Sequence, residues 1–497
     1  MSKIIQKIGL IIISLFIIEV LSFSAIFSTL AAYIIFAILV LATFIISIYN
    51  LEYGLLIVLG ELFVGSMGHL FFISLGSYNL SIRVALWLVI MLVFVGKFIR
   101  QLIIKKQASP YLLSLKNFSA WKILSILGFF ILVGVLNGLG HHNNFSLILL
   151  DFNAWPYFLL IFPAIVIYDS YGSELINRLK IVFLASTIFL SLETLFLLFI
   201  FTHASAIGPD IYLWLRKTIV GEITPTTTGW PRIFIQGQSF LAIGFFILFW
   251  RQIINFKFKE FFSKINLGIL IISGGFLSAL LLSFSRSFWV ALIGVLVFSF
   301  ILIWYKFGFK KILIISVWLL SVLFISLSLI YLTAAWPYWH AQPSNFGQSL
   351  LARTNNNNDA AVASRWSLLP VLMKTISREP LLGQGFGSTI TYFSQDPRVL
   401  QNNPGGEYTT YAFEWGYLSM WLKIGFIGLL VYLLFLLKLI KDSLRLALKT
   451  NNYLFFALPA GVLFLVFTNI FTPYLNHPLG IGFIIISSCL IWLNRVY

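Results

Sequence analysis

Three residues of the chain combine a charged side chain with a position beside long hydrophobic runs. Arg286 lies between two such runs, Arg365 lies next to Trp366 in a polar stretch, and Glu414 comes just before another run. A guanidinium group binds phosphate through several donated hydrogen bonds, and a carboxylate can accept a proton as a general base. These residue types favour a site for an anionic, phosphate-bearing amphiphile, with Arg286, Arg365 and Glu414 as candidate catalytic residues.

Each of the three also has an explanation that involves no reaction. Arg286 could extend its charge to the membrane boundary, Arg365 could lie on the solvated face of a helix, and Glu414 could be stabilised at a helix N-terminus. The turn that holds Arg286 leaves little room for a solvated side chain, however. The apolar neighbours of Glu414 are expected to raise the pKa of its carboxyl, which suits a general base.

Further polar residues are candidates for substrate binding. Arg232 is predicted at the outer start of a hydrophobic span, with Gln236 and Gln238 one and two turns further in. Polar groups inside a membrane usually face an interior cavity, although hydrogen bonding between helices explains the glutamines equally well. Trp366 offers a flat apolar ring on which a sugar could stack, and Arg353 is a further basic residue of the same polar stretch.

The sequence contains no pattern that indicates a metal or a cofactor. The histidines, among them His141, His142, His203 and His340, lack the spacing of metal ligands. No nucleotide-binding or dinucleotide-binding glycine loop is present, and the single Cys489 lies in an apolar run. A reaction at this site must therefore use a substrate that carries its own leaving group.

The composition is that of a membrane protein. Of 497 residues, 60% are hydrophobic and 10% are charged, whereas soluble domains are about 25% charged. The long apolar runs predict an all-α polytopic fold with about 14 transmembrane helices of ~20 residues. The sixth run contains Asp151, Asn153, Pro156 and Pro163, and it is expected to be a broken or re-entrant helix. The predicted centres lie near Leu15, Leu39, Val64, Ile90, Phe130, Leu159, Leu190, Phe245, Leu277, Val295, Leu320, Leu430, Phe464 and Ile485.

The net charge of +17 does not indicate nucleic-acid binding, because most basic residues fall in short loops between the hydrophobic runs. From the fourth run onward, every loop after an even-numbered run is basic, which places both termini in the cytoplasm. The first run, from about Ile8 to Leu30, is too long for a signal peptide and is predicted to be retained. The basic loops contain Arg100 to Lys122, Arg178 and Lys180, Arg251 to Lys264, Lys306 to Lys311, and Lys438 to Lys449.

One large polar loop interrupts the pattern and is predicted to face outward. It divides the chain into residues 1–333 with spans 1 to 11, residues 334–411 as the extracytoplasmic loop, and residues 412–497 with spans 12 to 14. Short amphipathic helices are expected in the loop, and one of them should begin at Asp359 as N-cap and end at Glu379-Pro380, with Pro370 distorting it. Its predicted apolar face consists of Val362, Trp366, Leu369, Met373 and Ile376.

The order of these features resembles the bacterial O-antigen ligase and O-antigen polymerase superfamily from about Trp230 to the C-terminus. Ser285-Arg286 stands at a turn between spans, and Ser364-Arg365-Trp366 is followed by Glu379-Pro380-Leu381-Leu382-Gly383-Gln384-Gly385, which is similar to the family's Pro-Leu-x-Gly-x-Gly segment. Glu414-Trp415, nine residues, and then Gly425 and Gly428 resemble the ligases' His-polar-x-nine-Gly-x-x-Gly motif, with Glu in place of His.

The resemblance implies an inverting glycosyltransferase without metal or nucleotide sugar, in the bacterial cytoplasmic membrane. Its donor would be a glycan on polyprenyl (undecaprenyl) diphosphate, and its acceptor would be a second lipid-linked glycan in a polymerase, or a lipid A core sugar or a protein in a ligase. Arg286 and Arg365 would hold the diphosphate, Glu414 would take the hydroxyl proton, and Arg232 would line the lipid path. Glu414 in place of His slightly favours the polymerase branch. The implied partners are membrane lipid and a chain-length regulator or flippase.

A flippase for lipid-linked oligosaccharides, or another transporter, is the main alternative, and a non-catalytic membrane scaffold is a third. Flippases of this kind also have about 14 spans and cavities rich in basic residues. They need no long outer loop, and charge deep in their spans is expected. Here the mid-span positions are almost free of charge, with Glu19, Glu61 and Glu193 as the main exceptions.

A reporter fused at Asn356, within the predicted outer loop, tests the topology. We expect activity from an extracytoplasmic reporter and none from a cytoplasmic one, because the basic loops stay in the cytoplasm. A fusion at Lys441 in a basic loop is the matched control and should give the opposite result. Cytoplasmic activity at Asn356 would remove the basis for a reaction on the outer face.

Overall fold

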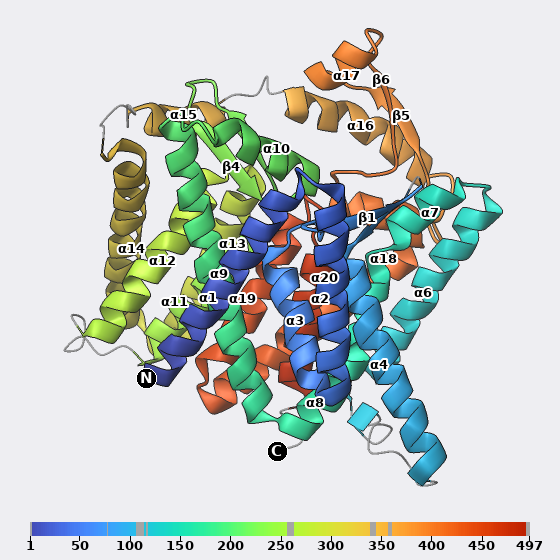
Figure 1. Ribbon diagram of the computed structural model, residues 1–497, viewed down its shortest axis with the longest axis horizontal. Helices are drawn as coiled ribbons and strands as arrows, with labels where there is room; N and C mark the ends of the chain where they lie inside the picture. Colours follow the sequence, from blue (N-terminus) through green and yellow to red (C-terminus); the bar gives the residue numbers. More distant parts are fainter. Residues whose placement is uncertain are drawn as a thin grey trace.

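The structure is a computed structural model of the chain, in which long helices run side by side and smaller elements collect at one end (Figure 1). It describes residues 2–76, 78–105, 114–115, 118–255, 263–337, 344–355 and 360–493.

Short polar residues begin several of the helices. The side chain of Ser28 accepts a hydrogen bond from the N–H of Ala31, and Asn50 caps the next helix through Glu52 N at 2.9 Å. The elements of the N-terminal part are α1 (Ser2–Ala25), α2 (Thr29–Tyr49), α3 (Leu51–Val64), β1 (Phe72–Leu75), β2 (Tyr78–Ser81), α4 (Ile82–Lys105), α6 (Trp121–Gly140), α7 (Phe145–Phe152), a 3₁₀ helix (Trp155–Leu160), α8 (Ile161–Tyr171), α9 (Ser173–Thr202) and α10 (Gly208–Thr218).

The C-terminal part contains the large loop, whose elements lie between α14 and α18. The elements of the whole C-terminal part are β3 (Gly221–Pro225), β4 (Pro231–Ile235), a 3₁₀ helix (Gln236–Gln238), α11 (Ser239–Asn255), α12 (Lys264–Leu282), α13 (Arg286–Phe307), α14 (Phe309–Ala335), α15 (Ser344–Asn355), α16 (Ala360–Ile376), β5 (Ile390–Phe393), α17 (Pro397–Asn402), β6 (Glu407–Thr410), α18 (Gly416–Thr450), α19 (Tyr453–Thr468) and α20 (Pro478–Trp492).

The described residues contain 11 segments that are long and apolar enough to cross a membrane, so the predicted count of 14 is not confirmed. The remaining three predicted spans correspond to α3, α19 and α20, which have 14, 16 and 15 residues. A 15-residue helix is only about 22 Å long, against ~30 Å for the hydrocarbon core. Most side chains of α19 and α20 are buried, so these helices pack inside the bundle and need not match the thickness of the lipid.

The sixth predicted segment is broken, as expected. It consists of α7, a 3₁₀ helix and α8, and each proline lies in the first turn of its helical piece, where a missing N–H costs least: Pro156 in the 3₁₀ helix and Pro163 in α8. The break leaves Asp151 and Asn153 near the end of α7.

In the described part of the chain, three antiparallel hairpins join the helices: β1 with β2, β3 with β4, and β5 with β6. The second hairpin corrects a prediction. Arg232 lies on β4 opposite Thr224, and Gln236 and Gln238 lie in the 3₁₀ helix that leads into α11. The prediction that the glutamines lie one and two turns inside a span is therefore wrong, because strand pairing holds this segment extended until the span begins.

The loop helix α16 exists as predicted, but its apolar face was partly misassigned. Leu368, Leu372 and Ile376 are buried, whereas Trp366 and Met373 are exposed. The buried side chains pack in one cluster with Ile390, Phe413 and Leu422. The face is thus set by contact with β5 and with the residues around the start of α18, which periodicity alone cannot show. The predicted N-cap Asp359 lies outside the described residues.

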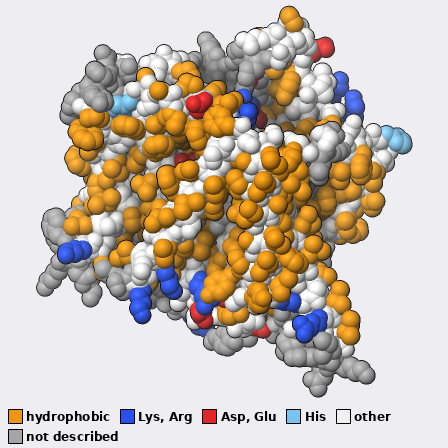
Figure 2. Space-filling view, in the orientation of Figure 1, with side chains coloured by type: hydrophobic (Ala, Val, Ile, Leu, Met, Phe, Trp, Pro, Cys, Tyr) orange, Lys and Arg blue, Asp and Glu red, His pale blue; other side chains and the backbone are white. Residues whose placement is uncertain are grey.

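The two ends of the molecule differ. Both chain termini lie at the lower end in Figure 1, and α15, α16, α17 and the β5–β6 hairpin lie at the upper end. Hydrophobic side chains cover the middle of the visible face, and Lys and Arg side chains gather mainly along its lower edge (Figure 2).

Candidate functional site

Arg365 and Glu414, 49 positions apart in the sequence, form an ion pair in the large loop. Arg365 Nε donates to Glu414 Oε2. The two side chains are 32% and 51% exposed, so a substrate can reach both. The expected apolar environment of the Glu414 carboxylate is not found, because half of the side chain is exposed and the carboxylate pairs with a guanidinium group.

The backbone around this pair is anchored on both sides. Phe413 is buried in the cluster with Leu368 and Leu372, which fixes the residue before Glu414. Trp415 Nε1 donates to the carbonyl oxygen of Arg365 at 3.0 Å. The rings of Trp366 and Trp415 meet edge to face at 5.5 Å. The start of α18 and the first half of α16 are thus held together at the pair.

A second group of predicted residues surrounds the turn between α12 and α13. Arg232 Nε donates to the carbonyl oxygen of Ser283 at 3.0 Å, and Arg286 is the first residue of α13 after its N-cap Ser285. Between them Phe284 is fully buried with φ +47°. The two arginines therefore flank one tight turn that a buried phenylalanine holds in place.

Helix α15 covers this turn and connects it to the β3–β4 hairpin. Its Phe346 ring lies 5.3 Å from Trp230 and 5.8 Å from Phe284, and the hydroxyl of Ser349 lies 2.9 Å from that of Thr226. Arg353 lies in the last turn of α15. Arg232, Arg286 and Arg353 thus come from three elements, β4, α13 and α15, that lie around this turn.

The two groups are linked through the connection between α19 and α20. Ser287 Oγ and Thr472 Oγ1 are 3.1 Å apart, and the ring of Phe471 lies 5.7 Å from that of Trp415. The residue after Arg286 is therefore connected to the residue after Glu414 through two adjacent side chains.

The two glutamines serve the structure of the turn into α11. Gln238 is fully buried, and its amide donates to Ile233 O at 3.2 Å and to Thr194 Oγ1 at 3.3 Å. Gln236 accepts from the hydroxyl of Tyr474 through its carbonyl oxygen at 3.0 Å. For Gln238, hydrogen bonding between elements is therefore the better of the two predicted explanations.

The two glycine motifs of the sequence dock against each other. Helix α18 is broken at Gly425, where φ is +72°. The N–H groups of Phe426 and Ile427 after the break donate to the carbonyls of Pro380 and Leu381, and Leu422 O before the break accepts from Gln384 N at 2.7 Å. The segment 380–388 thereby satisfies backbone groups that the broken helix leaves free.

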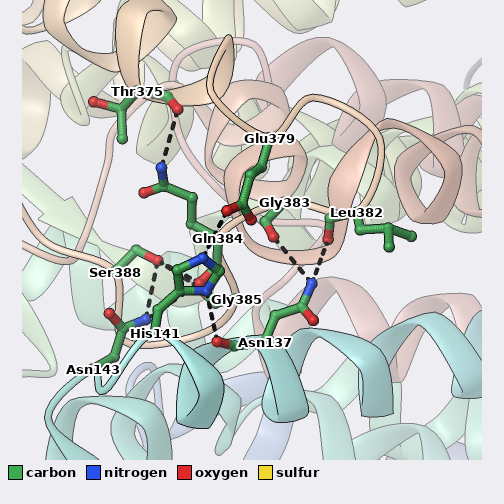
Figure 3. A network of polar contacts seen from close by, with 10 residues as sticks. All are labelled: Asn137, His141, Asn143, Thr375, Glu379, Leu382, Gly383, Gln384, Gly385 and Ser388. Atoms are coloured by element: carbon green, nitrogen blue, oxygen red, sulfur yellow. Dashed lines mark hydrogen bonds and ion pairs between the residues drawn. The ribbon is translucent and has the colours of Figure 1, made fainter.

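Helix α6 and the turn that follows it support the other side of this segment, through residues that the sequence had not indicated (Figure 3). Asn137 Nδ2 donates to the carbonyls of Leu382 and Gly383 at 3.2 and 3.0 Å, and Asn143 Nδ2 donates to that of Phe386 at 2.9 Å. The signal that could have found them is Asn137 followed by the polar residues His141 to Asn144 at the end of a span.

A buried ion pair completes the support. Lys423 Nζ lies 2.5 Å from Asp151 Oδ1, and Asp151 Oδ2 accepts from the N–H of Gly387 at 3.1 Å. Lys423 Nζ also lies 5.3 Å from the ring centre of Phe413. A single lysine within the apolar start of α18 is the signal that could have identified this residue, because a charge in a span usually has a specific partner.

Two apolar cavities lie elsewhere, with volumes of about 460 and 810 Å³. Elements α1, α9 and α10 line the first, and α1 to α4 with α9 line the second; no predicted site residue lines either one. Their charged lining residues are Glu19, Glu61, Glu193, Lys7 and Arg178. This lining is not the strongly basic one expected for transport of a diphosphate. Among the described residues, no group of His, Cys, Asp and Glu could hold a metal ion.

The Gly385→Ala substitution tests the docking of the glycine segment on α6. Gly385 has φ +84°, and a Cβ there would lie 2.0 Å from Gly138 N. The unfavourable φ alone costs roughly 1–2 kcal/mol, and the overlap adds to it, so we expect a lower melting temperature and faster proteolysis of the loop. Gly128→Ala on α6, where a Cβ meets nothing within 4 Å, should match the parent. Equal proteolysis of both variants would contradict the docking.

The His141–Glu379 contact should make the stability of the loop depend on pH. His141 Nε2 lies 2.8 Å from Glu379 Oε1 and Nδ1 lies 2.8 Å from Asn137 O, so both ring nitrogens face acceptors. The hydrogen bond to Glu379, followed by that to Asn137, raises the pKa of His141. Protonated His141 therefore contributes its full stabilisation of the loop below about pH 6.5, the ordinary pKa of histidine. This stabilisation is lost as the pH rises through the raised pKa of His141.

The measurement is the melting temperature from about pH 6 to about pH 8.5, the range in which histidine titrates. The parent should lose more stability over this range than His141→Asn, while His142→Asn, which changes the exposed neighbour, should follow the parent. Identical pH profiles of the parent and His141→Asn would show that the contact contributes nothing.

A comparison with known protein families covers the part of the chain that contains the candidate site. The family model described as O-antigen ligase (Wzy_C) matches residues 267–433. The matched part runs from α12 to the first half of α18 and includes Arg286, Arg365, Glu414 and both docked glycine motifs. No curated protein matches the chain. Residues 267–433 of this polytopic membrane protein therefore form an O-antigen ligase domain of the Wzy_C family, whose members transfer glycans in the assembly of O-antigen and lipopolysaccharide.

Proposed function

We propose that the protein transfers a glycan from polyprenyl (undecaprenyl) diphosphate to a sugar hydroxyl on the outer face of the bacterial cytoplasmic membrane. The observation that carries the proposal is the accessible Arg365–Glu414 ion pair inside the O-antigen ligase domain. It joins a phosphate-binding group to a proton acceptor. The position of both termini at the end opposite the large loop supports an outer location of the loop, with the termini in the cytoplasm (Figure 1).

The reaction requires one nucleophilic displacement. The acceptor hydroxyl oxygen forms a bond to the anomeric carbon of the donor glycan, on the face opposite the departing phosphate oxygen. The bond between the anomeric carbon and that oxygen breaks, and polyprenyl diphosphate leaves with the electron pair. The hydroxyl proton passes to the carboxylate of Glu414. This geometry inverts the anomeric configuration and needs no metal ion.

The ion pair suggests how donor binding prepares the base. In the resting protein the carboxylate of Glu414 is engaged with the guanidinium group of Arg365. A diphosphate carries more negative charge than a carboxylate and competes for the same donors. When Arg365 turns to the diphosphate, the carboxylate of Glu414 becomes free to accept a proton. The base is thus available when the donor is bound.

The turn between α12 and α13 would hold the rest of the diphosphate. Arg286 and Arg232 flank this turn, and α15, which contains Arg353, packs against it. Guanidinium groups fixed before the reaction stabilise the charge that develops on the leaving group without reorganisation. Arg286 and Arg365 are therefore the proposed stabilisers of the leaving group, and Arg232 and Arg353 the proposed binding residues.

We favour a polymerase, whose acceptor is a second lipid-linked glycan, over a ligase that acts on a lipid A core. Glu414-Trp415 stands where the ligase motif has His and a polar residue, and the Arg365 contact gives the carboxylate a partner suited to its charge. A chain-length regulator or a flippase would be the protein partners of such an enzyme.

Purified protein and a polyprenyl-diphosphate glycan test the proposal directly. We expect longer glycans and released polyprenyl diphosphate, in EDTA and without ATP. Arg286→Ala should abolish turnover, because the leaving group loses its charge partner. Glu414→Gln should lower turnover by roughly 10²- to 10⁴-fold, the usual contribution of general base catalysis.

Glu407→Gln is the matched control, since Glu407 is an exposed carboxylate on β6 of the same loop. It should turn over like the parent. If Arg286→Ala and Glu414→Gln also turn over like the parent, the assigned site is wrong.

A further inference from the structure

The β5–β6 hairpin has two different faces. The register pairs Ile390 with Thr410 and Tyr392 with Tyr408, and successive side chains of a strand point to opposite faces. Ile390 is buried against α16, and Tyr392 packs on the same cluster. Tyr408 and Tyr392 therefore share the face that is turned toward α16, and Phe393 lies on the opposite face.

The α16 face of the hairpin lies beside the Arg365–Glu414 pair. Ser367 Oγ donates to the carbonyl of Phe393 at 2.7 Å, which holds the turn of α16 after Arg365 against the end of β5. Burial raises the pKa of the Tyr392 hydroxyl, and the nearby Glu414 carboxylate raises it further. The two tyrosine rings meet at 6.0 Å and 80°.

Aromatic rings thus lie near the pair on β5 and on α16, through Tyr392 and Trp366, and Tyr408 of β6 packs against Tyr392. Tyr408 is 42% exposed and Trp366 is 59% exposed, and Trp366 directly follows Arg365. Aromatic rings of this kind bind ligands that have an apolar face and a polar edge. A pyranose ring is such a ligand, because its C–H groups form the face and its hydroxyls form the edge.

We propose that Trp366, Tyr392 and Tyr408 form a binding surface for the sugar residues of the acceptor glycan next to Glu414. This inference rests on the proposed function, in which Glu414 takes the proton from the acceptor hydroxyl. The acceptor is assigned here because Tyr392 lies near Glu414, the proposed base. Of the four arginines proposed for the donor diphosphate, only Arg365 is beside this surface, and Arg232, Arg286 and Arg353 are placed around the α12–α13 turn.

A lipid surface is the other ligand that exposed aromatic residues could contact. The hairpin does not fit it well. Neither strand contains Lys or Arg, and the hydroxyls of Thr391 and Thr409 pair at 2.7 Å on the exposed opposite face. In Figure 1 the hairpin also extends upward, away from the bundle. These features favour a ligand in water over the headgroup layer.

The first experiment measures binding without turnover. The probe is the lipid-free oligosaccharide released by mild acid from the host's own polyprenyl-diphosphate glycan, added to the full-length protein in detergent while tryptophan fluorescence is followed. Tyr408→Ala should weaken binding by roughly three- to tenfold, the range for one aromatic contact. Tyr408→Phe should retain most of it. Phe393→Ala, an exposed aromatic residue on the opposite face of the same hairpin, is the matched control and should bind like the parent.

The second experiment separates acceptor from donor. Tyr408→Ala should raise the KM for the acceptor by a similar factor, with kcat and the KM for the donor little changed. A raised donor KM in its place would overturn the acceptor assignment. Equal binding of the oligosaccharide by the parent and Tyr408→Ala would overturn the sugar surface. If Tyr408→Ala and Phe393→Ala then both lower the membrane association of the loop, the hairpin contacts lipid instead. If the parent shows no turnover, the proposed function fails, but the binding experiment still decides this inference.

Discussion

The segment 380–388 fills the break of α18 at Gly425, and the position of the candidate site depends on this contact. A broken helix within a bilayer exposes N–H and C=O groups that cannot reach water, and each unsatisfied group costs several kcal/mol. Here the loop supplies both the donor for Leu422 O and the acceptors for Phe426 and Ile427 N–H. The backbone N–H and C=O groups of the broken helix therefore bind the loop. The glycines of the loop allow the two backbones to approach each other closely.

The same contact determines where the reactive groups lie. Glu414 precedes α18 by two residues, and Arg365 lies on α16, whose end leads directly into the docked segment. Fixing that segment on α18 and α6 brings the two helices together, so the ion pair forms between residues that lie far apart in the sequence. The buried Lys423–Asp151 pair, Asn137 of α6 and Asn143 in the turn after α6 hold the docked segment on its other side. Rigid support of this kind is what a preorganised charge-stabilising site requires.

The N-terminal helices play a different part. Helices α1 and α2 have few buried side chains, and their cavities contain carboxylates in an apolar lining. Glu61 has its partner within the bundle, since Arg83 donates to both of its carboxylate oxygens at 2.9 and 3.0 Å. The residues proposed for glycan transfer belong to the C-terminal part, where the family match also lies.

Hydrophobicity, proline positions and isolated charges act locally, so the sequence was enough to predict the all-α membrane architecture, the broken sixth segment and the large loop, and to select Arg365 and Glu414 as candidates. The packed structure was needed to reveal that α3, α19 and α20 are short, since buried helices need not match the bilayer. It also decided which face of α16 is buried and that Asn137, Asn143, Asp151 and Lys423 support the loop. Those residues act through partners about 240 to 270 positions away, and no local pattern contains such contacts.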